Sequence, residues 1–120
     1  MADKNEKLYQ MSFAKIYPLL INKAIRKGRT EEEVQIVIEW LTGYKKDDIR
    51  VAVNKNIAYR QFFEQAPRLN PNRKLIKGIV CGVRVEEISE PIMQEIRYLD
   101  KLIDELAKGK TIEKILRASE

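Results

Sequence analysis

Apolar residues recur along most of this chain at the three- and four-residue spacing that is typical of one helical face. The first such pattern lies in SFAKIYPLLINKAIRKG, residues 12–28. Because Pro18 removes a backbone donor and clashes with the preceding turn, we expect the regular helix to begin near Tyr17, with residues 13–16 as a looser turn. Gly28 is expected to end the helix in the left-handed conformation.

The next helix has the clearest start signal in the sequence. Thr30 and Glu33, in the run TEEE, have the spacing of a capping box, in which each side chain accepts a hydrogen bond from the other residue's backbone N–H. Apolar residues within positions 34–41 predict a largely buried helix, and Gly43 marks its end. Further helical patterns predict elements over residues 45–54, 57–66 and 91–108, and after Thr111.

Residues 70–88, NPNRKLIKGIVCGVRVEEI, allow two interpretations. Asn70 followed by Pro71 is a good helix start, and the apolar residues after it keep a helical spacing, so we favour a helix. A strand is the alternative over residues 79–86, because that part alternates and is rich in β-branched residues.

In the helical interpretation, Gly78 and Gly82 lie on one face, where the lack of side chains allows close packing of another helix. That helix belongs either to the same chain or to a second copy. Cys81, between them, is expected to be buried and inert. The alternative is a reactive thiolate favoured by the neighbouring charges of Lys77 and Arg84.

Taken together, these patterns predict an all-α protein, a single compact domain of about six or seven short helices plus one long C-terminal helix. We expect residues 1–12 to be a polar N-terminal tail and residues 13–118 to form the domain, since 120 residues suit one hydrophobic core. Apolar runs of three or four residues predict no membrane span, and the polar first residues favour a cytoplasmic location. A single cysteine agrees with a reducing compartment.

Composition also limits the chemistry. The chain has no histidine, which excludes a Ser-His-Asp or Cys-His arrangement within one chain, and one cysteine without histidine excludes an ordinary zinc site. It also lacks the glycine-rich motifs that bind nucleotide phosphates and dinucleotides. We therefore expect no metal and no cofactor, and we consider an enzyme that uses Cys81 or the adjacent Glu86 and Glu87 only as a third possibility.

Charge is distributed unevenly, with a net charge of +5. Residues 60–84 hold six basic residues and one acidic residue, whereas the chain after residue 84 is acidic. One interpretation is that the basic residues pair with the acidic helix that follows. The other is an anion-binding patch, for a small ligand or for nucleic acid, which would consist of Asn70, Asn72, Arg73, Lys74, Lys77 and Arg84.

The sequence contains the phrases RKGRTEEEV, WLTGY, FFEQAP, NPNRKLIKGIVCGVRVEEI and MQEIRYLDKLIDELAKGKTIEKILR. In these phrases the chain, from about Phe13 to Arg117, resembles a family of small uncharacterised bacterial proteins, the twenty-two-hundredth in the series of domains of unknown function. The resemblance implies a compact, mainly helical bacterial protein and brings no reaction, ligand or partner with it.

From the residues we expect a non-enzymatic protein that acts by binding, either to itself or to another protein. The motivation is an apolar helical surface with a glycine stripe and segregated basic and acidic faces. The alternative is a binder of an anionic ligand or nucleic acid through the basic segment at residues 60–84.

Overall fold

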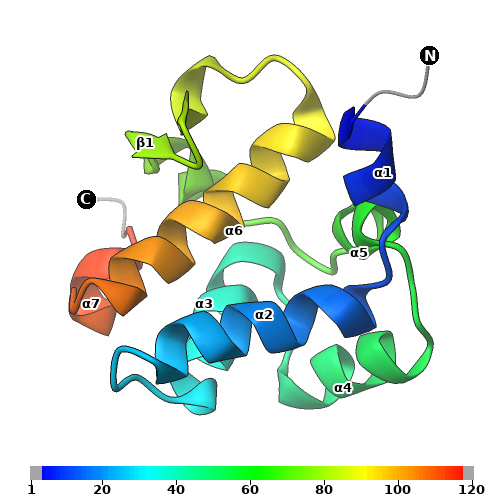
Figure 1. Cartoon of the computed structure of the whole chain (residues 1–120), viewed down its shortest axis with the longest axis horizontal. Coiled ribbons are helices and arrows are strands. Elements are labelled where there is room, and N and C mark those ends of the chain that lie inside the picture. Colours follow the sequence, from blue (N-terminus) through cyan, green and yellow to red (C-terminus); the bar gives the residue numbers. More distant parts are fainter. Residues whose placement is uncertain (1–3, 118–120) are drawn as a thin grey trace.

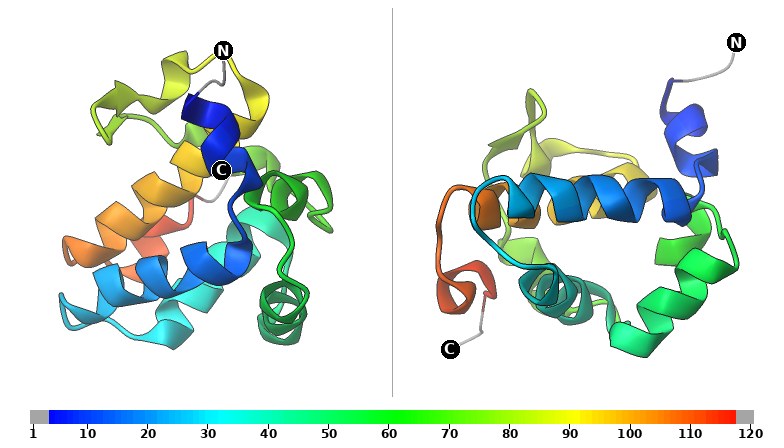
Figure 2. Two further views of the ribbon diagram at one scale, coloured as in Figure 1. Left: turned by 45° about the vertical axis from the view of Figure 1, so that its right-hand side comes forward. Right: turned by 60° about the horizontal axis from the view of Figure 1, so that its bottom comes forward.

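The computed structural model of the chain describes residues 4–117, and helices form most of its regular structure (Figure 1). The long helix α6 packs along α2, and α3 packs against both of them. The other elements lie around this centre, with α7 at the end of α6 and a small β-hairpin against its side (Figure 2). The elements are α1 (Lys4–Gln10), α2 (Phe13–Ile25), α3 (Glu31–Thr42), α4 (Lys46–Asn54), α5 (Tyr59–Glu64), η1 (Pro71–Leu75), β1 (Ile79–Val80), β2 (Val83–Arg84), η2 (Val85–Glu87), α6 (Pro91–Ala107) and α7 (Ile112–Ile115).

Aromatic rings fill the part of the core near α5. The Phe62 ring stacks between Phe13 and Tyr44, with centroid distances of 4.0 and 4.4 Å, and Phe63 meets it edge to face. Such pairs add about 0.5–1.5 kcal/mol each to the free energy that comes from burying their area. These contacts join residues from three parts of the chain in one core, and the predicted all-α single domain is confirmed.

Two local signals act as predicted. Thr30 Oγ1 accepts from the Glu33 N–H at 3.2 Å, and Glu33 Oε1 accepts from the Thr30 N–H at 3.0 Å, so the capping box is complete. The long helix begins at Pro91, whose preset φ suits the first turn.

The first main helix begins earlier than predicted, at Phe13 instead of near Tyr17. The Ser12 side chain accepts from the Ala14 N–H at 3.1 Å and caps the helix ahead of the proline. Pro18 lies inside α2 on its exposed face, where its cost of about 3 kcal/mol is tolerated. Burial of Phe13 and other apolar residues on the opposite face offsets this cost, since each stabilises by about 1.5–3 kcal/mol.

The predicted polar tail over residues 1–12 is wrong for residues 4–10, because they form α1 and pack against α5. Residues 1–3 of the predicted tail and residue 118 of the predicted domain lie outside the described residues. Tyr9 is only 6% exposed, and its hydroxyl donates to the Glu90 carboxylate. A single turn or two with few apolar residues carries too weak a periodicity for this docking to be predicted from the sequence.

The favoured helix over residues 70–88 is wrong, and the strand alternative is closer. The chain forms the short 3₁₀ helix η1 and then a hairpin in which Val80 pairs with Val83. Cys81 and Gly82 have φ values of 52° and 78°, and two positive φ values in succession are what a type I′ hairpin turn requires. The side chains of Val80 and Val85 are buried beside α6. The alternation of buried and exposed residues and the conformation of the turn therefore determine that this segment forms a hairpin.

The predicted helical stripe of Gly78 and Gly82 is therefore wrong as well. No atom lies within 4 Å of where a Cβ of Gly82 would be, and the nearest atoms to such a Cβ at Gly78 belong to the flexible Lys101 side chain. The glycines serve the backbone of the hairpin, not the approach of a second helix. None of the helices between residues 4 and 117 combines the length and the apolar character that crossing a bilayer needs.

Candidate functional site

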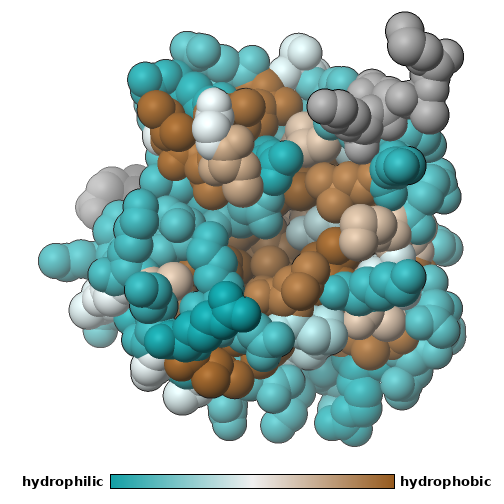
Figure 3. Space-filling model, viewed as in Figure 1, coloured by the Kyte–Doolittle hydropathy of each residue, from teal (hydrophilic) through white to brown (hydrophobic). Residues whose placement is uncertain are grey.

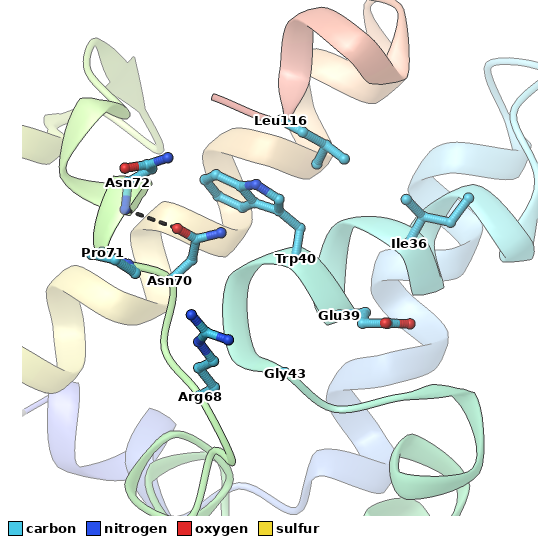
Figure 4. Close-up of a pocket in the computed structure, with 9 residues that line it drawn as sticks. All are labelled: Ile36, Glu39, Trp40, Gly43, Arg68, Asn70, Pro71, Asn72 and Leu116. Atoms are coloured by element: carbon cyan, nitrogen blue, oxygen red, sulfur yellow. Dashed lines mark hydrogen bonds between the residues drawn. The ribbon is translucent and has the colours of Figure 1, made fainter. Parts of the chain in front are cut away.

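A cleft of about 690 Å³ opens between the C-terminal half of α3, the extended segment 68–72 and the end of α7 (Figure 4). It combines one aromatic ring, several aliphatic groups, two amides, one guanidinium and one carboxylate. Its lining residues are Ile36, Glu39, Trp40, Gly43, Arg68, Asn70, Pro71, Asn72 and Leu116.

Backbone hydrogen bonds hold the segment 68–72 against the end of α3. The Arg68 N–H donates to the Thr42 carbonyl at 2.9 Å, and the Asn70 N–H donates to the Leu41 carbonyl at 3.0 Å. A helix end leaves such carbonyls without partners, so the passing segment satisfies them. The segment 68–72 and the end of α3 come so close at Gly43, whose φ is 83°, that a Cβ there would lie 2.9 Å from the Arg68 backbone nitrogen.

The residues after Trp40 make this wall rigid. The buried Thr42 hydroxyl donates to the Ile38 carbonyl at 2.7 Å and accepts from the Tyr44 N–H at 3.2 Å. The Tyr44 hydroxyl donates to the Phe62 carbonyl at 2.7 Å, and burial raises the pKa of Tyr44 to about 12. The segment WLTGY, residues 40–44, thus connects the cleft to the aromatic core.

The amide of Asn70 has one fixed orientation. Its Oδ1 accepts from the Asn72 N–H at 2.9 Å, so its Nδ2 faces away from that bond, toward Trp40 (Figure 4). Arg73 Nη1 also donates to the Asn70 carbonyl at 2.9 Å. The cleft therefore has an amide donor whose direction is set by its neighbours.

The third wall comes from the C-terminal part of the chain. Leu116 lies beside the half-buried indole of Trp40 (Figure 4). The next residue, Arg117, donates to both oxygens of Glu105 at 2.6 and 2.7 Å, and both side chains are largely buried. This ion pair fixes Leu116 against the ring.

The cleft carries one cation and one anion. Arg68 is exposed, and among residues 4–117 its guanidinium has no hydrogen-bond or ion-pair partner. Figure 4 shows its side chain extending toward Asn70 and Trp40, while Glu39 lies on the other side of Gly43. A guanidinium without a protein partner beside an amide donor is a suitable pair of donors for a carboxylate or phosphate.

The six residues predicted as an anion patch are not brought together. Asn70 and Asn72 line the cleft, but Arg73 pairs with Glu95 of α6 at 2.8 Å, with both side chains less than one-fifth exposed. Arg84 lies 3.7 Å from Glu86 and 3.9 Å from Glu87, and Lys74 and Lys77 are exposed outside the cleft. For Arg73 the structure thus agrees with the other interpretation of the charge distribution, in which basic residues pair with the acidic helix that follows.

Two cleft residues were missed as functional candidates, Trp40 and Arg68. Arg68 belongs to the basic segment 60–84, and Trp40 is the only tryptophan of the chain. Composition thus contained a signal for each residue, but nothing in the linear sequence placed them beside each other.

Cys81 is exposed at the hairpin turn, so the prediction of a buried cysteine is wrong. Its Sγ lies 4.0 Å from Asp100 Oδ2, and Asp100 accepts from Arg97 at 2.8 Å. Burial raises the pKa of the Asp100 carboxyl in spite of that guanidinium. These side chains lie outside the cleft.

Glu86 has a structural role, because its carboxylate accepts from the Gly78 N–H at 3.0 Å and helps to close the base of the hairpin. That hydrogen bond holds the pKa of Glu86 below its ordinary value. Within the described residues 4–117, no three His, Cys, Asp or Glu side chains gather in a way that could hold a metal ion.

The fold and the cleft define a small helical protein with a mixed aromatic and polar groove at the end of α3. Residues 7–117 match the model of the family described as "Uncharacterized protein conserved in bacteria (DUF2200)", and the chain belongs to this family. A crystal structure of "uncharacterized protein SP1917" has 50% sequence identity and a TM-score of 0.89, covering 97% of this chain and 93% of that chain. No protein of curated function matches the chain. The resemblance seen in the sequence is confirmed, and no function is established for the family or for this structural neighbour.

Proposed function

We propose that this protein is a non-enzymatic binding module whose ligand occupies the cleft between Trp40 and residues 68–72. The observation that carries the proposal is the Arg68 guanidinium, which has no protein partner among residues 4–117 and extends beside a half-buried indole. A cleft with a preformed apolar wall and a few directed polar groups is the usual form of a ligand site.

The residues that line the cleft favour ligand binding over catalysis. They include no hydroxyl, thiol or amine, and Glu39 is the one carboxylate among them. Covalent catalysis needs an activated nucleophile, and general acid–base catalysis needs groups with suitable pKa values around the reacting atoms. The lining instead supplies hydrogen-bond donors, one positive charge and apolar area.

Nucleic-acid binding is disfavoured at this site. A polyanion needs several cations along its path, whereas the lining has only Arg68 and also holds Glu39.

A fragment titration followed by NMR tests the proposal. Trp40 is the only tryptophan, so its indole N–H gives a single, assignable signal at the cleft. With ¹⁵N-labelled protein and a mixed set of charged and neutral ring compounds, we expect saturable shifts that gather on Trp40, Gly43 and Asn70. Shifts absent from this group at millimolar concentrations, or spread evenly over the surface, refute the proposed function.

Self-association is a second candidate, favoured by an apolar patch on the projecting hairpin (Figure 3). Leu75 at the end of η1 and Ile79 and Val83 in the hairpin are 49%, 57% and 41% exposed, so three aliphatic side chains of this part of the chain are in contact with solvent. Light scattering over a range of protein concentrations tests this candidate, and a mass that stays monomeric throughout rules it out. Replacing Ile79 with lysine is expected to abolish any dimer.

We also propose a cytoplasmic location for the protein. The support is Cys81, an exposed free thiol, because thiols of this kind persist in reducing compartments.

A further inference from the structure

We infer that the cleft binds a compact anion attached to a flat apolar ring, such as an aromatic carboxylate or an aromatic phosphate monoester. This inference rests on the proposed function and specifies the class of ligand. It follows from which groups the two walls of the cleft present to the space between them.

The polar wall is suited to a single anionic head group. Arg68 is held by its own backbone hydrogen bond to Thr42 at 2.9 Å, so the base of its side chain has a fixed position. Its planar guanidinium can donate two parallel hydrogen bonds to a carboxylate or phosphate. Asn70 adds a neighbouring Nδ2 donor, because its Oδ1 is already engaged by the Asn72 N–H at 2.9 Å.

The facing wall is suited to a ring. The indole of Trp40 is half-buried, Leu116 lies beside it, and Ile36 on the same helix is 44% exposed. Aromatic rings stack on an indole at centroid distances of about 4.5–7 Å, and a flat ligand loses little conformational entropy there. Because Leu116 and Ile36 continue the apolar surface of Trp40 on the side away from Arg68 (Figure 4), the ligand needs its charge at one end only.

Glu39 limits the total charge of the ligand. It borders the cleft from α3, on the other side of Gly43 from Arg68 (Figure 4). A second negative charge at that end would face this carboxylate. A ligand with one anionic group at the Arg68 end avoids this repulsion.

The test uses four probes that separate charge from ring: phenylacetate, phenyl phosphate, benzyl alcohol and acetate. Each is titrated into the ¹⁵N-labelled full chain, and the indole N–H of Trp40 and the side-chain amide of Asn70 are followed. We expect at least one of the two anionic ring compounds to bind with a Kd of about 1 mM or tighter. Benzyl alcohol and acetate should each bind at least tenfold more weakly.

Two variants test the assigned roles. Arg68→Gln should weaken binding of the anionic ring compounds roughly 10- to 100-fold and leave benzyl alcohol unchanged, because it removes charge-assisted hydrogen bonds alone. Trp40→Leu, followed through the Asn70 amide, should weaken every ring compound roughly 2- to 10-fold. Arg26→Gln is the matched control, since Arg26 is an exposed arginine outside the cleft and its loss should change no Kd.

The results separate this inference from the proposed function. If benzyl alcohol binds as tightly as phenylacetate and Arg68→Gln changes neither, the cleft is a ligand site but the anionic class is wrong. If no probe shifts the Trp40 signal, the inference fails, and the mixed fragment set then decides the proposed function. A peptide that ends in phenylalanine shows whether the carboxylate comes from a peptide terminus or from a small molecule, and the same peptide with an amidated end is its uncharged control. Tighter binding of the free acid than of phenylacetate indicates a peptide terminus. Weaker binding indicates a small molecule.

Discussion

Gly43 connects the stability of this fold to the shape of its cleft, and its replacement by alanine tests that connection. The φ of 83° at this position costs an L-residue about 1–2 kcal/mol. In addition, the new Cβ would lie 2.9 Å from the Arg68 nitrogen and 3.2 Å from its Cβ, so the segment 68–70 must move away from α3. That movement weakens the hydrogen bonds from Arg68 and Asn70 to the end of α3, each worth about 1 kcal/mol. We therefore expect Gly43→Ala to lower the free energy of unfolding by about 2–4 kcal/mol.

Urea unfolding followed by Trp40 fluorescence measures this loss, with circular dichroism as a second probe of two-state behaviour. Gly109→Ala is the matched control, because its φ is 93° but no atom lies within 4 Å of the added Cβ. It should show the conformational cost alone, about 1–2 kcal/mol. Equal losses in the two variants would refute the reasoning, since the close approach of Arg68 would then contribute nothing. Gly43→Ala should also weaken ligand binding in the cleft, whereas Gly109→Ala should leave it unchanged.

Three other measurements test separate parts of the structure. Arg117→Met leaves the buried Glu105 with only the more distant Lys110 ammonium, at 3.7 Å, and should cost about 3 kcal/mol in urea unfolding. Replacing Glu105 with leucine as well should recover most of this loss, and a double variant as unstable as the single one contradicts this explanation. Burial raises the pKa of Asp100, so the folded state binds that proton more tightly than the unfolded state does, and the charged form costs stability. As the pH rises from about 4, the ordinary pKa of aspartate, the unmodified protein should therefore lose stability relative to Asp100→Asn, and the reverse trend in urea unfolding would contradict the assigned burial. The thiol of Cys81 should react fully with Ellman's reagent in the native protein, and a thiol that reacts only after unfolding would contradict its exposure.

Helix positions could be read from the sequence wherever short-range interactions set them. The capping box of Thr30 and Glu33 and the proline at the start of α6 involve residues only a few positions apart, so their effect does not depend on the rest of the fold. The start of α2 was predicted wrongly because only the cost of Pro18 to helix stability was considered. The burial of Phe13, which offsets it, comes from α5 and the other core elements.

Residues 70–88 show where local patterns are insufficient. Their apolar residues fit a helix and a hairpin almost equally well, and Asn70 with Pro71 begins a 3₁₀ turn as readily as an α-helix. The hairpin forms because Val80 and Val85 can be buried beside α6 while Gly82 adopts the positive φ of the turn. That choice depends on a surface far away in the sequence.

The composition and periodicity of the chain were enough to establish an all-α domain, its main helices and the absence of histidine chemistry. They could not establish the candidate site, because Trp40, Arg68, Asn70 and Leu116 belong to three separate parts of the chain. Backbone hydrogen bonds from Arg68 and Asn70 to the end of α3 bring two of these parts together, and the buried pair of Glu105 and Arg117 holds the third. Such bonds form between groups that every residue carries, or between common charges, and so no sequence pattern marks them; the cleft exists only once the helices have packed.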